Sequence, residues 1–334
     1  LEKRAQQILE SMRAPVHLSG QYLTIPTSIG VSFTDQKDID AEKLIQQADI
    51  AMYWAKDKGR DNAQFFTPKM ASIVSKKFGF EKEINEALLL EQFHLVFQPQ
   101  VFMGKENIVA LEALIRWDHP TKGIISPAEF IPIAEESSLI MKIDEWVIDQ
   151  ALKQQKSWQD QGLALVPVAI NLSGRHLVSD SLVPYISKKL KDYGIKGDLL
   201  EIEITEGVLL QDIERCIDVM ADLKILNIKI SVDDFGTGYS SLSYLKRLSL
   251  DTLKIDKSFV EECGLYTEDT SICEAIIHLA RNLNLTVVAE GVETVSQVRV
   301  LKSLGCEIFQ GYYYYKPMKN DQIVCLLAKA HSVD

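Results

Sequence analysis

Short runs of strand-forming residues alternate with longer stretches of helical periodicity from about Phe93 onward, and this alternation constrains the fold more than any other feature. The runs span residues 93–98, 108–115, 165–170, 199–205, 228–232, 252–256, 286–290 and 307–310. Amphipathic stretches such as 141–161 and 267–284 separate most of them. Short continuous apolar runs are typical of parallel strands buried on both faces. The pattern therefore predicts an α/β fold, a (β/α)8 TIM-like barrel.

The interval between the first two runs departs from this pattern. Only about nine residues (99–107) separate them, whereas a parallel crossover needs roughly a dozen or more. We therefore predict that the first strand of the barrel is antiparallel to its neighbour.

The first 67 residues have a different organisation. We expect a helix over 1–13, a strand-like run over 22–33, a helix opened by Asp40 and ended at Gly59, and a short strand over 63–66. We therefore divide the chain into three regions. They are a small α+β region over 1–67, a linker or connecting helix over 68–80, and the barrel over 81–334. Pro68 is expected to end the short strand, with residues 67–77 as a connector. Two helices of the barrel are expected to begin with capping boxes, at Ser126–Glu129 and Thr294–Gln297.

Polar side chains occur at or near the ends of most predicted strands. They are Glu112, Arg116, Asn171, Glu203, Glu206, Asp233, Asp234, Lys254, Asp256, Glu290, Glu293 and Gln310. Because the carboxyl ends of barrel strands meet at one mouth, we expect many of these side chains to converge there.

Carboxylates crowded in this way repel each other unless some are protonated or cations bind among them. An all-oxygen set suits Mg²⁺ or Mn²⁺, while the scattered histidines make zinc a weaker candidate. Asp233 and Asp234 point different ways in an extended chain, so one can bridge two ions. Two ions ~3.5–4 Å apart are a usual device for activating water against a phosphoester, and Lys254 would stabilise the developing negative charge.

Simpler explanations exist for single residues. Any one acid can be a helix cap or a solvated loop residue, and Glu206 can act only as a hydrogen-bonding partner. Gly236, Gly238 and Tyr239 can form an ordinary turn or a mobile loop. Glu112 and Glu203 are harder to explain in this way, because each lies inside an apolar strand where an unpaired charge is costly. Spacing alone thus predicts a metal-dependent barrel enzyme without naming a substrate.

Composition restricts the partners and the compartment. The formal net charge is −11, which argues against polymeric nucleic acid or an anionic membrane as the main partner. Five cysteines without a CxxC pair suit reduced thiols in the cytoplasm. The longest apolar stretch, 163–170, is shorter than the ~18 residues of a spanning helix. We expect no membrane contact within this chain and, since it starts at Leu1, a longer parent protein, for which a membrane tether stays open.

The barrel region resembles the EAL-domain family of cyclic-di-GMP phosphodiesterases across roughly residues 78–330. The matching motifs, in order, are Gln98-Pro99, Glu112-Ala-Leu114 with Arg116, Asn171-Leu-Ser173, Glu203-Ile-Thr-Glu206, Asp233 through Tyr239, Leu253 through Lys257, Glu290-Gly-Val-Glu293 and Gln310-Gly-Tyr312. The resemblance implies hydrolysis of one phosphodiester of cyclic-di-GMP to linear 5′-pGpG with two divalent cations, Mg²⁺ or Mn²⁺.

The same resemblance implies roles for single residues. Glu112, Asn171, Glu203 and Asp233 would hold one metal, and Asp233 with Asp234 the second. Glu290 would be the general base or orient the water, and Lys254 would contact that water. The residues that would bind the nucleotide are Gln98, Leu114, Arg116, Glu293 and Gln310. Glu206 would anchor the loop that contains Gly236 and Gly238.

One departure is the aromatic stretch Tyr312–Tyr315, which either stacks on a guanine or packs outside the barrel; packing is the preferred interpretation. No predicted metal-site position is replaced. The main alternative is a catalytically silent cyclic-di-GMP receptor, and a metal-dependent barrel lyase is a weaker one. We also expect a homodimer through the loop after Asp234 and the helix that follows it.

The N-terminal residues resemble the C-terminal part of a GGDEF domain, the diguanylate cyclase family. The matching segments are 28–31, 48–56 and 59–62. The GGDEF signature itself does not occur in the chain, so the resemblance implies a remnant without cyclase activity. We expect this remnant to be the least stable part of the chain.

Overall fold

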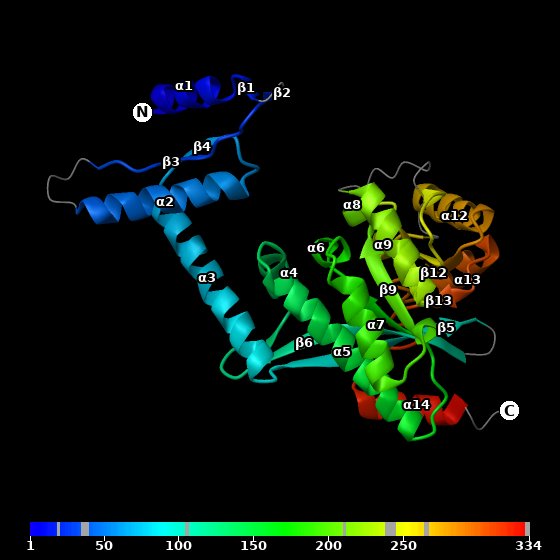
Figure 1. Ribbon diagram of the computed structural model, residues 1–334. Coiled ribbons are helices and arrows are strands. Elements are labelled where there is room, and N and C mark those ends of the chain that lie inside the picture. Colours follow the sequence, from blue (N-terminus) through cyan, green and yellow to red (C-terminus); the bar gives the residue numbers. More distant parts are fainter. Residues whose placement is uncertain are drawn as a thin grey trace. The chain divides into compact units, whose positions relative to one another are not determined.

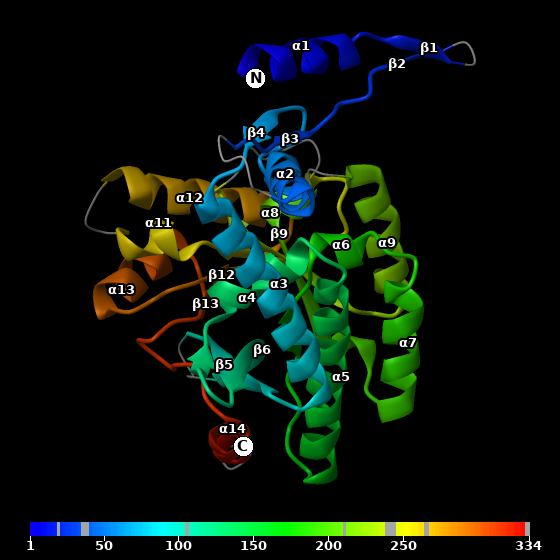
Figure 2. The same ribbon diagram turned by 90° about the vertical axis from the view of Figure 1, so that its left-hand side faces the viewer.

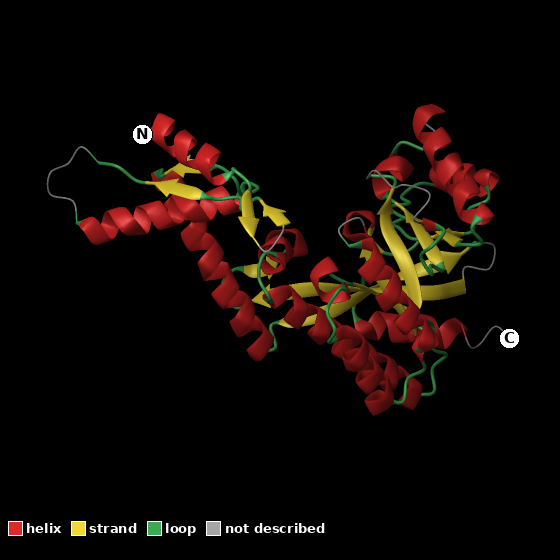
Figure 3. Ribbon diagram, turned by 45° about the horizontal axis from the view of Figure 1, so that its top comes forward, coloured by secondary structure: helices red, strands yellow, loops and turns green. Residues whose placement is uncertain are grey.

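Eight strands close into a barrel in the computed structural model (Figures 1 and 3). In chain order they are β5 (Phe93–Phe102), β6 (Asn107–His119), β8 (Val168–Asn171), β9 (Leu200–Thr205), β10 (Lys229–Phe235), β11 (Thr252–Ile255), β12 (Thr286–Ala289) and β13 (Ile308–Phe309). Neighbours from β6 to β13 pair in parallel, whereas β5 is antiparallel to both β6 and β13. The barrel with a single reversed first strand is therefore confirmed.

The structure describes residues 1–334 except 19–20, 35–39, 104–106, 210–211, 238–244, 264–266 and 331–334; side chains are also left undescribed at 18, 21, 76–78, 267–269 and 330. The chain divides into two units, Leu1–Glu83 and Ile84–Asp334. The boundary falls within α3 (Pro68–Leu89).

Helices of the second unit surround the barrel (Figure 2). They are α4 (Pro127–Glu135), α5 (Leu139–Asp160), α6 (Gly174–Leu177), α7 (Leu182–Tyr193), α8 (Glu206–Leu209), α9 (Ile213–Ile225), α11 (Lys257–Glu261), α12 (Thr267–Asn282), α13 (Val295–Leu304) and α14 (Asn320–Ala330), with a 3₁₀ turn at Gly197–Leu199. Helix α5 shows why such segments form. Ile143, Val147 and Ala151 recur at helical spacing and are buried, so the helix covers the barrel with one apolar face.

Details of the barrel region depart from the sequence expectations at two places. A short strand, β7 (Gly123–Ile125), pairs antiparallel with the end of β6 and was not predicted. The capping box at Ser126 is wrong: Ser126 is the N-cap residue of α4, but its side chain makes no capping hydrogen bond. The capping box at Thr294 and Gln297 is confirmed, with both reciprocal bonds formed.

The first unit contains α1 (Glu2–Met12), β1 (Val16–Leu18), β2 (Gln21–Leu23), β3 (Ile29–Val31), α2 (Ala41–Asp57) and β4 (Ala63–Phe65). The helix opened by Asp40 is confirmed, and the Asp40 carboxylate accepts a hydrogen bond from the Glu42 amide at 3.1 Å. Strands β3 and β4 pair in parallel beside α2. A Cβ at Gly30 would lie 2.0 Å from the Ala48 carbonyl oxygen, so only glycine allows this close approach.

One expectation for this unit is wrong. The run over 22–33 is not one strand: its ends belong to β2, which pairs with β1, and to β3, which pairs with β4. The connector expected over 67–77 is helical from Pro68, because proline is tolerated in the first turn of a helix, and α3 covers the connecting helix expected over 68–80. None of the helices within the described residues is long and apolar enough to cross a membrane.

Candidate active site at the mouth of the barrel

The strand register brings the predicted acids together. Gln98 on β5 lies opposite Glu112 on β6, and Asn171 at the end of β8 lies opposite Glu203 on β9. Asp233 on β10 is two residues beyond Ser231, the partner of Glu203, and side chains two apart on a strand share a face. Glu290 and Gln310 follow directly after β12 and β13. The barrel therefore brings these side chains together: those of β8 to β13 lie at or near the carboxyl ends of their strands, and Gln98 and Glu112 lie within β5 and β6.

Lys254 lies at the centre of this group and is fully buried. Its Nζ is 2.5 Å from Glu290 Oε1, 2.8 Å from Glu203 Oε2, 3.4 Å from Asp233 Oδ1 and 3.7 Å from Glu112 Oε2. A buried ammonium costs several kcal/mol unless it is paired, and four carboxylates here provide that pairing. The prediction that Lys254 lies within the acid group is in accord with these distances.

Glu112 is held by two side-chain amides. Asn171 Nδ2 donates to Glu112 Oε1 at 2.8 Å, and Gln310 Nε2 donates to Glu112 Oε2. Gln310 also donates to Gln98 Oε1 at 3.3 Å, while Gln98 Nε2 donates to the Tyr315 carbonyl oxygen at 3.0 Å. Both polar atoms of the buried Gln98 side chain are thus used within the protein. The resemblance assigns Gln98 to the nucleotide, but its contacts here position Gln310 and the turn at Tyr315.

Asp233, Asp234 and Glu290 form a second grouping. One carboxylate oxygen from each lies within 4.8 Å of the other two. Asp234 has a positive φ of 53°, and its amide donates to Asp233 Oδ1 at 3.0 Å. This backbone conformation allows two consecutive carboxylates to serve one small volume, which an extended chain would not allow.

Burial and neighbouring charges shift the pKa values of the acids in this site. Burial raises the pKa of Glu203 well above its usual range and that of Glu290 to about 8, since the charges of neighbouring acids add to the effect and Lys254 only partly offsets it. Burial and Asp233 together raise the pKa of Asp234 to about 6. The pKa of Glu112 is lowered instead: burial opposes its ionisation, but Lys254 and the bonds from Gln310 and Asn171 outweigh that cost. The acids of the site therefore differ in pKa: that of Glu112 is lowered, whereas those of Glu203, Asp234 and Glu290 are raised.

Charge and hydrogen bonding both fit divalent cations. Five carboxylates (Glu112, Glu203, Asp233, Asp234 and Glu290) and one ammonium leave a formal charge of −4 when all are ionised, which two divalent ions would neutralise. Glu203 Oε1 and Gln310 Oε1 are buried and have no hydrogen-bond partner, although buried acceptors are normally satisfied. Hard oxygen donors of this kind suit Mg²⁺ or Mn²⁺.

The segment after Asp234 is attached to Glu206. The Gly236 amide donates to Glu206 Oε2 at 2.9 Å, and Thr237 Oγ1 donates to the Asp234 carbonyl oxygen at 2.8 Å. Glu206 begins α8 and is buried. Gly238 and Tyr239 lie outside the described residues, as does most of the loop on which the predicted dimer interface falls.

Of the other residues assigned to the nucleotide, Leu114 and Arg116 line a pocket of about 370 Å³ next to Asn171. Arg116 Nη1 donates to the Ile115 carbonyl oxygen at 2.8 Å. Glu293 is exposed, and its backbone amide donates to Gln297 Oε1 at 2.8 Å. These contacts leave the assignment of Glu293 a prediction.

Sequence reasoning missed the wall of this pocket. Asp144 on α5 is buried, and its Oδ2 accepts from Ser173 Oγ at 2.5 Å and lies 3.4 Å from His176 Nδ1. Ser173 and Asp144 both line the pocket, and Glu135 joins them. The available signal was an aspartate at a position of α5 that otherwise belongs to its apolar face, between Ile143 and Val147.

Comparisons with known proteins agree with this architecture. The family model described as "EAL domain" matches residues 81–317, and the model described as "Diguanylate cyclase, GGDEF domain" matches residues 1–62. Two curated proteins of Pseudomonas aeruginosa are similar. The chain is 37% identical over 94% of its length to cyclic di-GMP phosphodiesterase NbdA, and 36% identical over 97% to the bifunctional diguanylate cyclase/cyclic di-GMP phosphodiesterase MucR.

The chain spans 40% of NbdA and 47% of MucR, less than half of each curated relative. A solved structure of the PaMucR phosphodiesterase in complex with c-di-GMP superposes with a TM-score of 0.71 at 39% identity, covering 73% of this chain and 99% of that one. The eight-stranded barrel with its reversed first strand, the acids at its mouth and a family match over residues 81–317 lead to one conclusion: the chain belongs to the EAL domain family.

Proposed function

We propose that this chain is a metal-dependent phosphodiesterase that hydrolyses cyclic-di-GMP to linear 5′-pGpG. The observation that carries the proposal is the complete acid set around buried Lys254, with Glu112, Glu203, Asp233 and Glu290 all within 4.0 Å of its Nζ. The names of the similar proteins and the c-di-GMP in the PaMucR complex support the choice of substrate. Residues 81–334 would be the catalytic part, 68–80 the connecting segment and 1–67 the GGDEF remnant.

In this proposal one group of residues binds the metal ions. Glu112, Asn171, Glu203 and Asp233 would hold one divalent ion, and Asp233 with Asp234 would hold the second. Bound ions of this type lower the pKa of water and neutralise charge on a phosphoryl group. The unpartnered Glu203 Oε1 supports such a ligand role.

Glu290 and Lys254 act on the attacking water. Glu290, with a pKa raised to about 8, accepts the proton of the water as its oxygen bonds to phosphorus and the P–O3′ bond breaks. The departing 3′ oxygen takes up a proton from solvent, Glu290 later releases its proton to solvent, and the phosphate stays on the 5′ oxygen, which gives the linear dinucleotide. Lys254, 2.5 Å from Glu290, stabilises the negative charge that develops.

Asp233→Asn tests the proposal, because it removes a charge and a metal ligand while nearly preserving shape. Purified protein is incubated with cyclic-di-GMP and Mg²⁺, and the nucleotides are separated by chromatography. We expect the wild type to form pGpG and excess EDTA to stop it, and we expect the variant to lose more than about 100-fold in turnover. Asp198→Asn, the same change at an exposed acid in the 3₁₀ turn, should keep wild-type turnover.

Two results would contradict the proposal. Near wild-type turnover by Asp233→Asn would exclude the two-metal site. Intact nucleotide after incubation, together with tight binding by calorimetry, would identify a receptor instead.

A further inference from the structure

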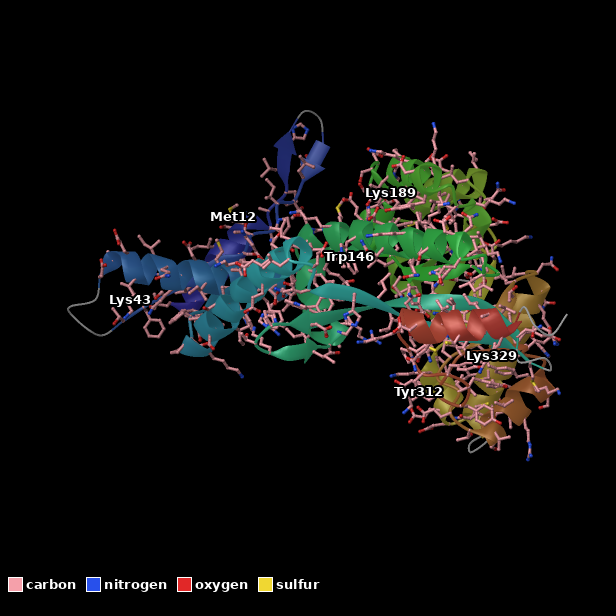
Figure 4. The ribbon with its side chains drawn as sticks, turned by 90° about the horizontal axis from the view of Figure 1, so that it is seen from below. Met12, Lys43, Trp146, Lys189, Tyr312 and Lys329 are labelled. Carbon is pink, nitrogen blue, oxygen red and sulfur yellow. The ribbon has the colours of Figure 1, made fainter. Side chains whose placement is uncertain are left out.

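A buried aspartate on α5 holds the chain just after β8, the strand that carries Asn171. Asp144 is 5% exposed, and its Oδ2 accepts hydrogen bonds from the Ser173 amide at 3.2 Å and from Ser173 Oγ at 2.5 Å. Figure 4 labels Trp146, two residues after Asp144 on the same helix. Ser173 is two residues after Asn171, the proposed metal ligand. A carboxylate from a helix that covers the barrel therefore fixes the backbone beside a candidate ligand at its mouth.

The chain between β8 and α6 is held from two sides. On the barrel side, the Leu172 amide donates to the Glu203 carbonyl oxygen at 2.9 Å, which continues the parallel ladder between β8 and β9. On the helix side, Ser173 is bound to Asp144 and is also the N-cap residue of α6, where its Oγ accepts from the His176 amide at 3.3 Å. Helix α6 has only four residues, and one helical turn is not stable by itself. The contact with Asp144 thus supplies support that so short a helix cannot give.

The side chain of Asn171 depends on this backbone for its orientation. Its Nδ2 donates to Glu112 Oε1 at 2.8 Å, so Oδ1 is the atom of this amide that a cation would use. Groups behind a metal ligand orient it, and their loss typically costs roughly 10–100-fold in metal affinity. A shift of the chain after β8 would move the amide away from Glu112 and from the ion.

Asp144 is not the residue that stability alone would favour at its position. It lies on the apolar face of α5 between Ile143 and Val147, both buried. A leucine there would be buried without the cost of taking a charge out of water. His176 Nδ1 lies 3.4 Å from Asp144 Oδ2, but within the described part of the chain neither nitrogen of this buried ring has a hydrogen-bond partner. A charge placed at this cost, with its bonds directed to Ser173, indicates positioning more than packing.

We propose that Asp144 is a positioning residue for metal binding: through Ser173 it fixes the end of β8, so that Asn171 presents its side-chain oxygen to the ion. The inference rests on the proposed function, because it assumes the ion that Asn171 would help to hold. Asp144 itself contacts neither the ion nor the reacting phosphorus. Its loss therefore weakens metal affinity, whereas the chemical step is retained once the metal is saturating.

The test compares Asp144→Leu with Asp144→Asn in the full chain, using Mn²⁺ alone as the probe. Calorimetric titration of protein freed of metal by EDTA and dialysis measures the affinity. We expect Asp144→Leu to weaken Mn²⁺ binding about tenfold. Asp144→Asn, whose side-chain oxygen can still accept from Ser173, should stay within about threefold of wild type. In turnover of cyclic-di-GMP, Asp144→Leu should need about tenfold more Mn²⁺ for half-maximal rate and regain at least about half of the wild-type kcat at saturation.

Gln155→Leu is the matched control, because Gln155 is also a buried polar residue on α5 and also holds the end of a strand. Its Nε2 donates to the Leu199 carbonyl oxygen at 2.6 Å, just before β9 begins. That contact lies at the amino end of the strand, away from the mouth. Gln155→Leu should lower the urea midpoint to a similar degree as Asp144→Leu and leave the Mn²⁺ affinity unchanged.

Ser173→Ala breaks the same link at its other end. The variant keeps the backbone amide that donates to Asp144, so we expect Mn²⁺ affinity to fall only about threefold. Combined with Asp144→Leu, it should cause little further loss, because both changes remove one contact.

The outcomes separate this inference from the function on which it rests. Wild-type Mn²⁺ affinity in Asp144→Leu, or an equal loss of affinity in Gln155→Leu, would overturn the positioning role even where turnover is normal. Additive losses in the double variant would also overturn it, since Asp144 and Ser173 would then act independently. A wild type that binds Mn²⁺ and leaves cyclic-di-GMP intact, with affinity lost in Asp144→Leu, would keep the positioning role and refute the enzyme. A wild type that binds no Mn²⁺ would overturn both.

Discussion

At the scale of the residue, the site is governed by one lysine among several carboxylates. Lys254 is fully buried, and the acids around it raise its pKa well above the usual value even though burial opposes this. It serves as a permanent internal counter-ion, whereas the remaining negative charge must be met by protons or by metal ions. Proton binding and metal binding therefore compete at this site.

This competition predicts how stability depends on pH. In the metal-free chain, the raised pKa of Asp234 (about 6) and of Glu290 (about 8) means that the folded state binds more protons than the unfolded state between roughly pH 5 and 8. The free energy of unfolding should therefore fall as pH rises through this window. The lowered pKa of Glu112 acts with the opposite sign but only below the ordinary range of a glutamate.

Urea denaturation in EDTA at pH 5.5, 7 and 8.5 measures this slope, and excess Mg²⁺ should stabilise the chain more at pH 8.5 than at pH 5.5. Glu290→Gln, which removes one of the titrating groups, should flatten the metal-free profile. A metal-free stability that increased from pH 5.5 to 8.5 would contradict this account of the site.

At the scale of the element, the end of β10 determines where the paired aspartates lie. The strand ends in Asp233, Asp234 and Phe235, and Gly236 follows with a φ of +101°. The Gly236 amide is held by Glu206 from the start of α8. Two elements that are adjacent in the barrel thus fix the turn that presents both carboxylates.

Gly236→Ala should destabilise the chain and reduce turnover. An added Cβ would meet Phe259 Cε2 at 2.9 Å and Ile276 Cδ1 at 3.2 Å, in a backbone conformation that already disfavours alanine. We expect a loss of about 2–4 kcal/mol, from strain of ~1 kcal/mol and overpacking of 1–3 kcal/mol.

Gly162→Ala is the control, because Gly162 also has a positive φ (+72°) but no atom within 4 Å of the added Cβ. It should cost only about 1 kcal/mol. Urea denaturation of both variants gives the comparison, and equal losses would show that packing around Gly236 contributes nothing.

At the scale of the whole molecule, the two units differ in how much apolar surface they bury. The barrel unit has a continuous core that includes Trp117, Trp158 and Phe97. The first unit exposes many large apolar side chains: Leu1, Ile8, Met12, Val16, Tyr22, Leu23, Ile25, Phe33, Ile45 and Ile73. Because buried apolar surface is the main source of stability, the first unit should open more readily.

Hydrogen exchange followed by mass spectrometry tests this difference. We expect amides of α1, α2 and β3 to exchange at least about tenfold faster than amides of β9 to β12, since each tenfold step corresponds to ~1.4 kcal/mol of opening free energy. Equal protection of β3 and β10 would show that the first unit is as stable as the barrel.

The sequence by itself determined the number and order of the eight barrel strands, the reversal of the first of them and the positions of the acids along the chain. These follow from local periodicity, from the length of one connection and from residue type, all of which act over short sequence distances. The capping box at Ser126 was wrong because a serine permits more than one local structure, and packing selects among them.

Only the tertiary structure decided which side chains meet. Lys254 pairs with Glu112 from a strand more than 100 residues earlier, and Gln98 reaches Tyr315 across the closure of the barrel. No local pattern encodes such contacts, because they depend on how the strands close and on which rotamers the packed interior allows. The same closure places Gln310 in the acid group and leaves Tyr312 exposed, although both belong to one short segment of sequence.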